Sequence, residues 1–210
     1  MNHKVPLVCI DTETTGLHVG HHEIFEIAMV RVDENYNLTD DYLHEFITVE
    51  HPERFDYYAQ KATGKRPEDL LNKTPANEVR QKIIEWIITL SPYHKIEPFG
   101  QNYYNFDTRM IKHFMGEDWT NKSSLYDRYF EKAKIDLRWK AKEFKKWIAP
   151  INNERFQKTG RVYKTLKDEK LETIAELCKV INHEAHTAMS DVKTTVECYK
   201  KLTTLMERGL

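Results

Sequence analysis

The segment that decides the fold is VPLVCIDTETTG, residues 5–16. Its first half, residues 5–10, is a short apolar run of the kind that forms a buried central strand. Its second half is polar and closes on a glycine, which predicts a turn over residues 11–16. Residues i and i+2 of an extended chain point to the same side, so Asp11 and Glu13 would converge at the carboxyl end of this strand. Proteins of the α/β class tend to place their sites at such strand ends.

The Asp11 and Glu13 pair has two interpretations. Adjacent carboxylates repel each other unless a cation lies between them, and their hard oxygen atoms suit Mg²⁺ or Mn²⁺. The pair therefore predicts a divalent-metal site. The alternative is that both acids merely open a loop, which the buried strand before them and the glycine turn after them disfavour.

The rest of the chain predicts an α/β domain. Residues 24–32 and 42–49 indicate two further strands joined by a hairpin connection at 33–41, so the first three strands form an antiparallel meander. The apolar spacing then becomes helical. We expect short strands at 96–100 and 133–136, a long loop at 150–170, and helices opening at 66–67 and over 75–90, 106–114, 139–147, 171–181 and 187–206. The predicted fold is a mixed sheet with helices on its faces.

Composition limits the class of protein. The 210 residues suit one domain, and 40% hydrophobic with 31% charged residues is ordinary for a globular protein with a core. No stretch approaches the roughly 18 apolar residues of a membrane helix, and the first apolar run ends in acids rather than a cleavage site. Cys9, Cys178 and Cys198 lie far apart without metal-ligand spacing, which indicates buried reduced thiols in a cytoplasmic protein with no membrane partner.

Positive charge is concentrated in one segment. The net charge is −1, yet residues 138–170 hold 11 Lys and Arg against 4 Asp and Glu. Aromatic residues are interleaved with these cations: Trp139, Phe144, Trp147, Phe156 and Tyr163. Such a segment can neutralise phosphates and stack on bases, although a run of this kind is more often a solvated helix face.

Two more places carry chemical groups. Asp107 follows a predicted strand and falls in the first turn of a helix, where an acid is also favourable for capping alone. His186 precedes a helix and Asp191 lies on it, although a lone histidine there is more often a cap or a surface residue. Four carboxylates and a histidine together are what two-metal phosphoryl hydrolysis requires, because the carboxylates hold the cations and the histidine accepts a proton from water.

The motifs as a set resemble the DEDDh exonucleases of the DnaQ-like group, which have the ribonuclease H-like fold. The resemblance is carried by IDTETTGL at 10–17, EIA at 26–28, GxNxxxFD at 100–107 and HxAxxD at 186–191, with further matches at 135–136 and 171–177. The histidine lies five residues before Asp191. The sister class has a tyrosine four residues before, and that position here is Thr187, so the histidine subclass is indicated.

The resemblance implies a fold, an activity and residue roles. The sheet would be mixed, with antiparallel first three strands and then parallel pairing, and residues 1–210 would form one exonuclease domain. The enzyme would remove 5′-mononucleotides from the 3′ end of a single-stranded nucleic acid by a two-metal mechanism. Two Mg²⁺ or Mn²⁺ ions would bind at Asp11, Glu13, Asp107 and Asp191, and His186 would be the general base. The residues that would contact or order the substrate site are Thr14, Leu17, Asn102 and Phe106, while Glu26 and Asp136 match acidic positions of the family without being ligands.

Some features stay open at this level. A basic insertion around 116–170 is longer than a minimal member of the family needs, and we interpret it as an arm that guides the strand. A proofreading subunit that acts with a DNA polymerase and a catalytically inactive nucleic-acid-binding module are the alternatives. The choice between DNA and RNA depends on contacts to the sugar 2′ position, which the motifs do not determine.

Overall fold

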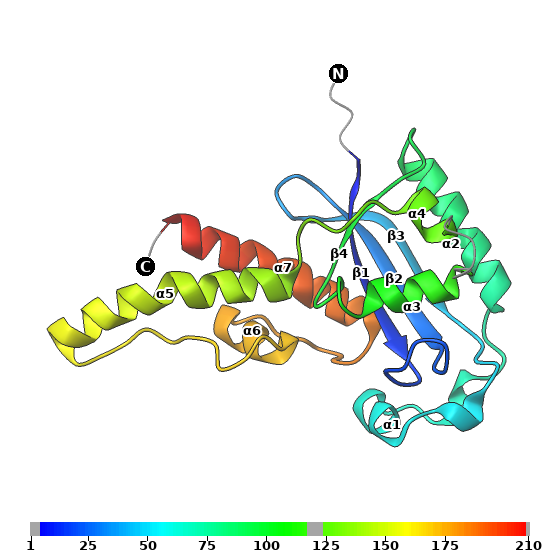
Figure 1. The fold of residues 1–210 in the computed structure, drawn as a ribbon, viewed down its shortest axis with the longest axis horizontal. Helices are drawn as coiled ribbons and strands as arrows, with labels where there is room; N and C mark the ends of the chain where they lie inside the picture. The colour runs from blue at the N-terminus through cyan, green and yellow to red at the C-terminus, as the bar shows by residue number, and fades with distance from the viewer. Residues whose placement is uncertain (1–4, 117–123, 209–210) are drawn as a thin grey trace.

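A computed structural model describes residues 5–116 and 124–208 of the chain (Figure 1). Its centre is a sheet of four strands, β1 (Leu7–Thr14), β2 (Ile24–Val32), β3 (Leu38–Phe46) and β4 (Glu97–Phe99), in the order β3-β2-β1-β4. Strand β2 pairs antiparallel with both β1 and β3, whereas β4 pairs parallel with β1. This topology confirms the predicted mixed sheet and its antiparallel meander.

Helices cover both faces of the sheet, as predicted. Helices α2 (Ala76–Leu90) and α3 (Asp107–Phe114) pack on one face, where they bury Ile10 and Ile27. Helix α7 (Ala188–Arg208) packs on the opposite face against Cys9 and Ala28. Successive side chains of a strand alternate between faces, which is why neighbours on β1 contribute to different clusters. Within the described residues, the remaining helices are α1 (Tyr57–Thr63), α4 (Leu125–Tyr129), α5 (Leu137–Thr159), α6 (Leu171–Cys178) and two 3-10 turns, Pro52–Arg54 and Pro67–Leu70.

The predicted turn at 11–16 is wrong in its first half, because β1 continues to Thr14. The strand is central and pairs with β2 as far as Glu13 opposite Glu26, so its backbone hydrogen bonds outweigh the polar character of its last residues. A bulge between Glu13 and Thr14 then ends the regular pairing. Both acids therefore lie on a rigid strand rather than on a loop, and β1 presents them toward the α7 face.

Two other sequence predictions differ from the structure. Strand β3 begins at Leu38 because the connecting turn is short: the Asp33 carboxylate accepts hydrogen bonds from the backbone of Asn35 and Asn37. Residues 133–136 are extended but form no strand, since Asp136 instead caps the start of α5 by accepting from the Arg138 N–H group.

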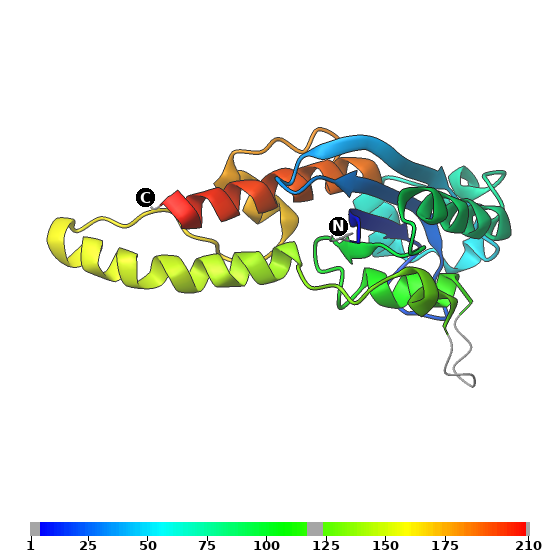
Figure 2. The same ribbon diagram turned by 90° about the horizontal axis from the view of Figure 1, so that it is seen from above.

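The predicted loop at 150–170 is wrong over residues 150–159, which continue α5 through Pro150 (Figure 1). The helix survives because Ile148 and Asn152 remain buried on either side of the proline. The Asn152 side chain donates to the Tyr163 carbonyl at 3.1 Å and accepts from its N–H at 2.7 Å, which ties the returning chain to the helix. Figures 1 and 2 show α5 and α7 side by side, extending away from the sheet. Residues 117–123 of the predicted insertion lie outside the described residues.

The structure agrees with the expectation for the cysteines. All three cysteines are buried and free of disulfides. Within residues 5–116 and 124–208, no helix combines the length and the apolar character needed to cross a membrane.

Candidate active site

The first two acidic residues, Asp11 and Glu13, lie on the same face of strand β1. Asp11 and Glu13 lie two residues apart on β1, on the face that α7 covers, while Thr12 between them points to the α3 side. Thr12 links the two sides: its N–H group and its hydroxyl both donate to Oδ1 of Asp107, at 3.1 and 2.6 Å. Strand β1 therefore orients Asp107, at the start of α3, through Thr12, which lies between Asp11 and Glu13.

The loop before α3 is held in one conformation by a network around Asn102, whose φ is +60°. The Asp136 carboxylate accepts hydrogen bonds from the N–H groups of Asn102, at 3.0 Å, and Tyr104, at 3.2 Å. The Arg138 guanidinium donates to Oδ1 of Asn102 at 2.8 Å. A Cβ atom on Gly100 would lie 2.4 Å from the Ile10 carbonyl oxygen, so the loop approaches β1 more closely than any other residue allows. Asn102 thus orders the loop that carries Asp107.

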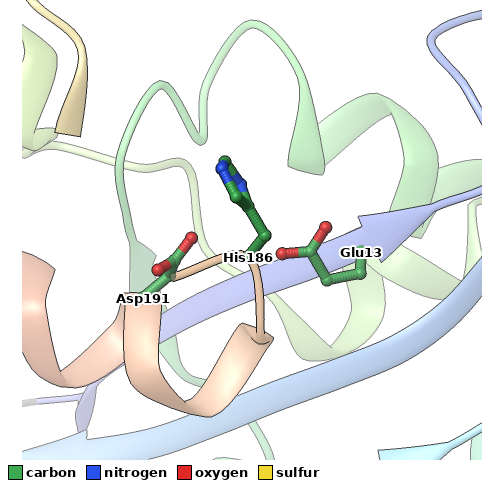
Figure 3. A group of neighbouring side chains, drawn as sticks. All are labelled: Glu13, His186 and Asp191. Carbon is green, nitrogen blue, oxygen red and sulfur yellow. The ribbon is translucent and has the colours of Figure 1, made fainter. Parts of the chain in front are cut away.

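The last two predicted residues, His186 and Asp191, lie close to Glu13 of β1 although 173 and 178 positions of sequence separate them from it. His186 has a φ of +65° and turns the chain into α7, where Asp191 donates its N–H to the Thr187 carbonyl. One ligand atom each from Glu13, His186 and Asp191 lies within 4.8 Å of the others. Figure 3 shows both carboxyl groups turned toward the space beside the imidazole ring. Asp191 is held by Asn182, whose amide donates to its Oδ1 at 2.7 Å.

The electrostatics of the cluster show an excess of negative charge. Burial raises the pKa of Asp11 well above its usual range, and the neighbouring charges of Asp107 and Glu13 add to this effect. Burial together with Asp191 raises the pKa of Glu13 to about 8. Burial also raises the pKa of Asp107 to about 7, against the opposing hydrogen bonds from Thr12. For Asp191, burial raises the pKa while the Asn182 hydrogen bond lowers it.

These shifts and the donor set test whether divalent cations fit. The pKa values are raised because these carboxylates are buried close to one another without a positive partner, and oxygen donors of this kind suit Mg²⁺ or Mn²⁺. The four carboxylates therefore fit hard divalent cations.

A cleft of about 440 Å³ lies beside this cluster. Glu13 lines it together with three of the four residues predicted to contact substrate: Thr14, Leu17 and Phe106. Asn102 is not part of its lining. A larger groove of about 860 Å³ runs along the outer side of α7 and includes none of the five predicted catalytic residues.

Tyr58, which was not predicted from the sequence, also lines the cleft and is 78% exposed. Tyr58 lies on α1, which Asp56 caps by accepting from the Tyr58 N–H group at 2.7 Å. The Asp56 N–H group in turn donates to the Thr15 carbonyl at 2.7 Å, so α1 is anchored to the end of β1. An aspartate followed by an aromatic pair was the signal in the sequence, because Asp is a favourable helix cap.

The mixed sheet, the helices on both faces and the carboxylate cluster at the end of the central strand define an α/β nuclease with the ribonuclease H-like fold. The chain belongs to the exonuclease family: the family model RNase_T, described as Exonuclease, matches residues 8–199. No curated protein sequence matched the chain. The DnaQ-like assignment from the motifs is confirmed by this match and by the fold.

Solved structures of exonuclease I share this fold. A complex of the E. coli enzyme with a dT13 oligonucleotide superposes with a TM-score of 0.73 at 17% identity, over 98% of this chain and 42% of the other. The zinc-bound form of the E. coli enzyme with single-stranded DNA gives 0.73 at 18% identity, with the same coverage. A complex of exonuclease I described as ExoI/SSB-Ct gives 0.72 at 17% identity and again covers 98% and 42%. The present chain thus spans less than half the length of these proteins.

Proposed function

We propose that the chain is a 3′→5′ exonuclease of the DEDDh type that releases 5′-mononucleotides from single-stranded nucleic acid. The observation that supports this most directly is the convergence of Glu13, His186 and Asp191 within 4.8 Å, although the three come from opposite ends of the chain. Asp11 lies two residues before Glu13 on the same face of β1, and Asp107 accepts hydrogen bonds from Thr12, the residue between them, so the remaining two residues adjoin this cluster. All five residue types of the family motif therefore lie in one place.

Under this proposal the carboxylates of Asp11, Glu13, Asp107 and Asp191 would hold two divalent cations. Such cations, when bound, supply positive charge beside the scissile phosphate and favour deprotonation of the attacking water. The protein contributes a rigid frame for them. β1 carries two of the ligands, and Thr12 and Asn182 orient the other two through hydrogen bonds of 2.6 and 2.7 Å.

His186 would accept the proton of the attacking water. A neutral imidazole is a suitable base near neutral pH, provided that it lies within reach of the water. The carboxylates of Glu13 and Asp191 beside it would stabilise the imidazolium that forms. His186 has a left-handed backbone conformation, with φ +65°, which a residue other than glycine keeps only where the surrounding contacts enforce it. A ring nitrogen of His186 lies within 4.8 Å of a carboxylate oxygen of Glu13 on β1.

The cleft beside Glu13 would hold the terminal nucleotide. Leu17 is 75% exposed and Tyr58 78% exposed, so both present apolar surface to a base, while the backbone around Thr14 faces the same cleft. Exposed aromatic groups next to a phosphate site are typical of single-strand binding, since every base offers a face for stacking. Phe106 closes the cleft beside Asp107.

The basic segment would guide the strand toward this cleft. Arg138, at the start of α5, contacts Asn102 of the loop before Asp107, and Lys142 and Lys146 follow it at four-residue spacing on the exposed helix surface. Residues four apart lie on the same face of a helix. A row of cations that starts at the site and leads away from it is suited to successive phosphates. We accordingly propose one exonuclease domain with an arm built on α5.

Labelled oligonucleotides test the polarity and the chemistry. We expect Mn²⁺ or Mg²⁺ to release labelled mononucleotide at once from a 3′-labelled single strand, and successively shorter products from a 5′-labelled one. Matched DNA and RNA strands and duplexes with recessed 3′ ends would define the substrate. Release of the 5′ label first would refute the polarity, and an intact strand with both the wild type and Asp11→Ala would refute the activity. Turnover that appears only when a polymerase is added would support the proofreading alternative.

Variants of His186 and Asp191 test the proposed roles of these two residues as base and metal ligand. His186→Ala should retain metal binding and lose most of kcat, because it removes a proton acceptor and no ligand. Asp191→Ala should also weaken metal binding, measured by calorimetric titration with Mn²⁺. His183→Ala, an exposed histidine three residues away, is the matched control and should behave as wild type. Equal metal affinity and equal residual rates in the first two variants would contradict this assignment.

A further inference from the structure

Glu26 is a completely buried carboxylate to which the proposed chemistry assigns no role. It lies on β2 directly opposite Glu13 of β1, and its side chain is on the face covered by α7. Like charges directly opposite on neighbouring strands are unfavourable. A buried carboxylate at this position therefore needs a reason that packing does not supply.

The hydrogen bonds of Glu26 identify that reason. Its Oε1 accepts from the backbone N–H group of Ala188, at 3.1 Å, across 162 positions of sequence. Ala188 is the first residue of α7 and is itself fully buried. The first N–H groups of a helix have no partner within the helix, and they are usually satisfied by a side chain just before it. Here the cap comes instead from a strand of the central sheet.

A histidine holds this carboxylate in place. Nε2 of His44, on β3, lies 2.9 Å from the same Oε1 atom of Glu26. Strand β2 lies between His44 on β3 and the carboxylates on β1, so His44 reaches the site only through Glu26. Among the described parts of the chain, Oε2 of Glu26 accepts no hydrogen bond from any side chain or backbone group. The Glu26 side chain is thus oriented through Oε1 alone, which contacts both His44 of β3 and Ala188 of α7.

We propose that Glu26 is a positioning residue for His186. The helix start that it caps lies two residues after His186, whose φ of +65° gives the turn a conformation that only firm anchoring maintains. Capping Ala188 from β2 fixes the distance between the His186 turn and β1, because β2 carries Glu26 opposite Glu13. The inference rests on the proposed role of His186 as the base. It adds Glu26 as the group that holds His186 at the right distance from the carboxylates.

Variants at position 26 separate positioning from metal binding. Glu26→Ala removes the acceptor and should lower kcat about 10–100-fold, the usual effect of losing a supporting contact, with KM and Mn²⁺ affinity changed less than about twofold. Glu26→Gln keeps an acceptor oxygen for the Ala188 N–H group and should restore kcat to within a few-fold of wild type. Glu45→Gln is the matched control, because Glu45 lies next to His44 on β3 but accepts a hydrogen bond from Lys82 rather than from α7.

A double variant tests whether Glu26 acts through the histidine. In a His186→Ala background, Glu26→Ala should cause no further loss of kcat, because residues that act through one group are not additive. A purely structural role would lower the residual rate again by a similar factor. If Glu26→Ala does not fold, Glu26→Asp serves instead, since its side chain is too short to reach Ala188 and should lose kcat in the same way.

Three results would overturn the proposal. A loss of Mn²⁺ affinity of tenfold or more in Glu26→Gln would make Glu26 a metal ligand. Full activity in Glu26→Asp would show that the cap is dispensable, and additive losses with His186→Ala would separate it from the base. The proposed function fails differently: in that case the wild type has no exonuclease activity, or His186→Ala keeps full activity, whatever Glu26 does.

Discussion

Replacing Glu13 by Gln should stabilise the metal-free protein at neutral pH. The pKa of Glu13 is raised from 4.5 to about 8 because the side chain is buried beside Asp191 and Glu26. The unfolded chain therefore releases this proton at a lower pH than the folded chain does. The resulting penalty is absent below about pH 4.5, grows as the pH rises, and is complete above about pH 8.

The magnitude follows from the same values. Each pH unit between 4.5 and 7 lowers the free energy of unfolding by about 1.4 kcal/mol. An isolated group with these pKa values would therefore destabilise the folded chain by about 3 kcal/mol at pH 7. Glu13 is partly exposed and shares its charge excess with neighbouring carboxylates, so we expect a gain of about 1–3 kcal/mol for Glu13→Gln. For a chain of this length that corresponds to a rise in Tm of about 2–12 °C.

Urea unfolding with EDTA at about pH 4 and about pH 7.5 measures this effect, with unchanged m-values as the check on two-state behaviour. Glu34→Gln, in the exposed hairpin turn, is the control. Added Mg²⁺ or Mn²⁺ should reverse the order, because ligand binding stabilises the wild type and the variant has lost a ligand. Equal stabilities of wild type and Glu13→Gln at pH 7.5, or a difference that persists at pH 4, would refute the electrostatic reasoning.

Three further variants probe the cleft, the loop and the arm. Tyr58→Ala should raise KM about 5–150-fold with kcat nearly unchanged, as expected for a stacking contact of about 1–3 kcal/mol. Tyr42→Ala on β3 should leave KM unchanged, and equal effects of the two variants in steady-state assays would exclude stacking. Gly100→Ala should cost about 2–3 kcal/mol in urea unfolding, since its Cβ would lie 2.4 Å from a backbone oxygen, and a neutral result would mean that the loop can shift. Lys142→Glu combined with Lys146→Glu should reduce the slope of log Kd against log salt concentration by about 1.4 for long single strands. Dinucleotide cleavage should stay unchanged, and an unaltered slope would show that these lysines do not contact the strand.

Much of the fold could be predicted because local patterns carried it. The bounds of β2 agree with the prediction, since Ile24–Val32 is a nearly continuous apolar run that only a buried strand accommodates. Helix α7 and the helix after Pro75 likewise followed from apolar spacing and caps. The nuclease assignment is confirmed by the family match, while the roles of the individual site residues and the polarity of cleavage stay predictions.

The wrong turn and loop predictions share one physical cause. Polar residues were interpreted as signals for turns and loops, but tertiary contacts satisfied their backbones instead. Pairing with β2 extended β1 through Glu13, and the buried side chain of Asn152 carried α5 past Pro150. Propensity is a weak guide where hydrogen bonds and burial from distant segments compensate for it.

The sequence by itself determined which groups are available: two acids at i and i+2 after a buried strand, an acid at a helix start, and a histidine five residues before another acid. Their chemistry follows from residue type, which is why a divalent-metal site was predictable. Only the tertiary structure decided which groups meet. The contacts of Thr12 with Asp107 and of Glu26 with Ala188 span 95 and 162 positions of sequence, and no local pattern specifies such pairs. They form because the sheet and its two helical layers bury a shared core, and that burial places the helix starts of α3 and α7 beside β1.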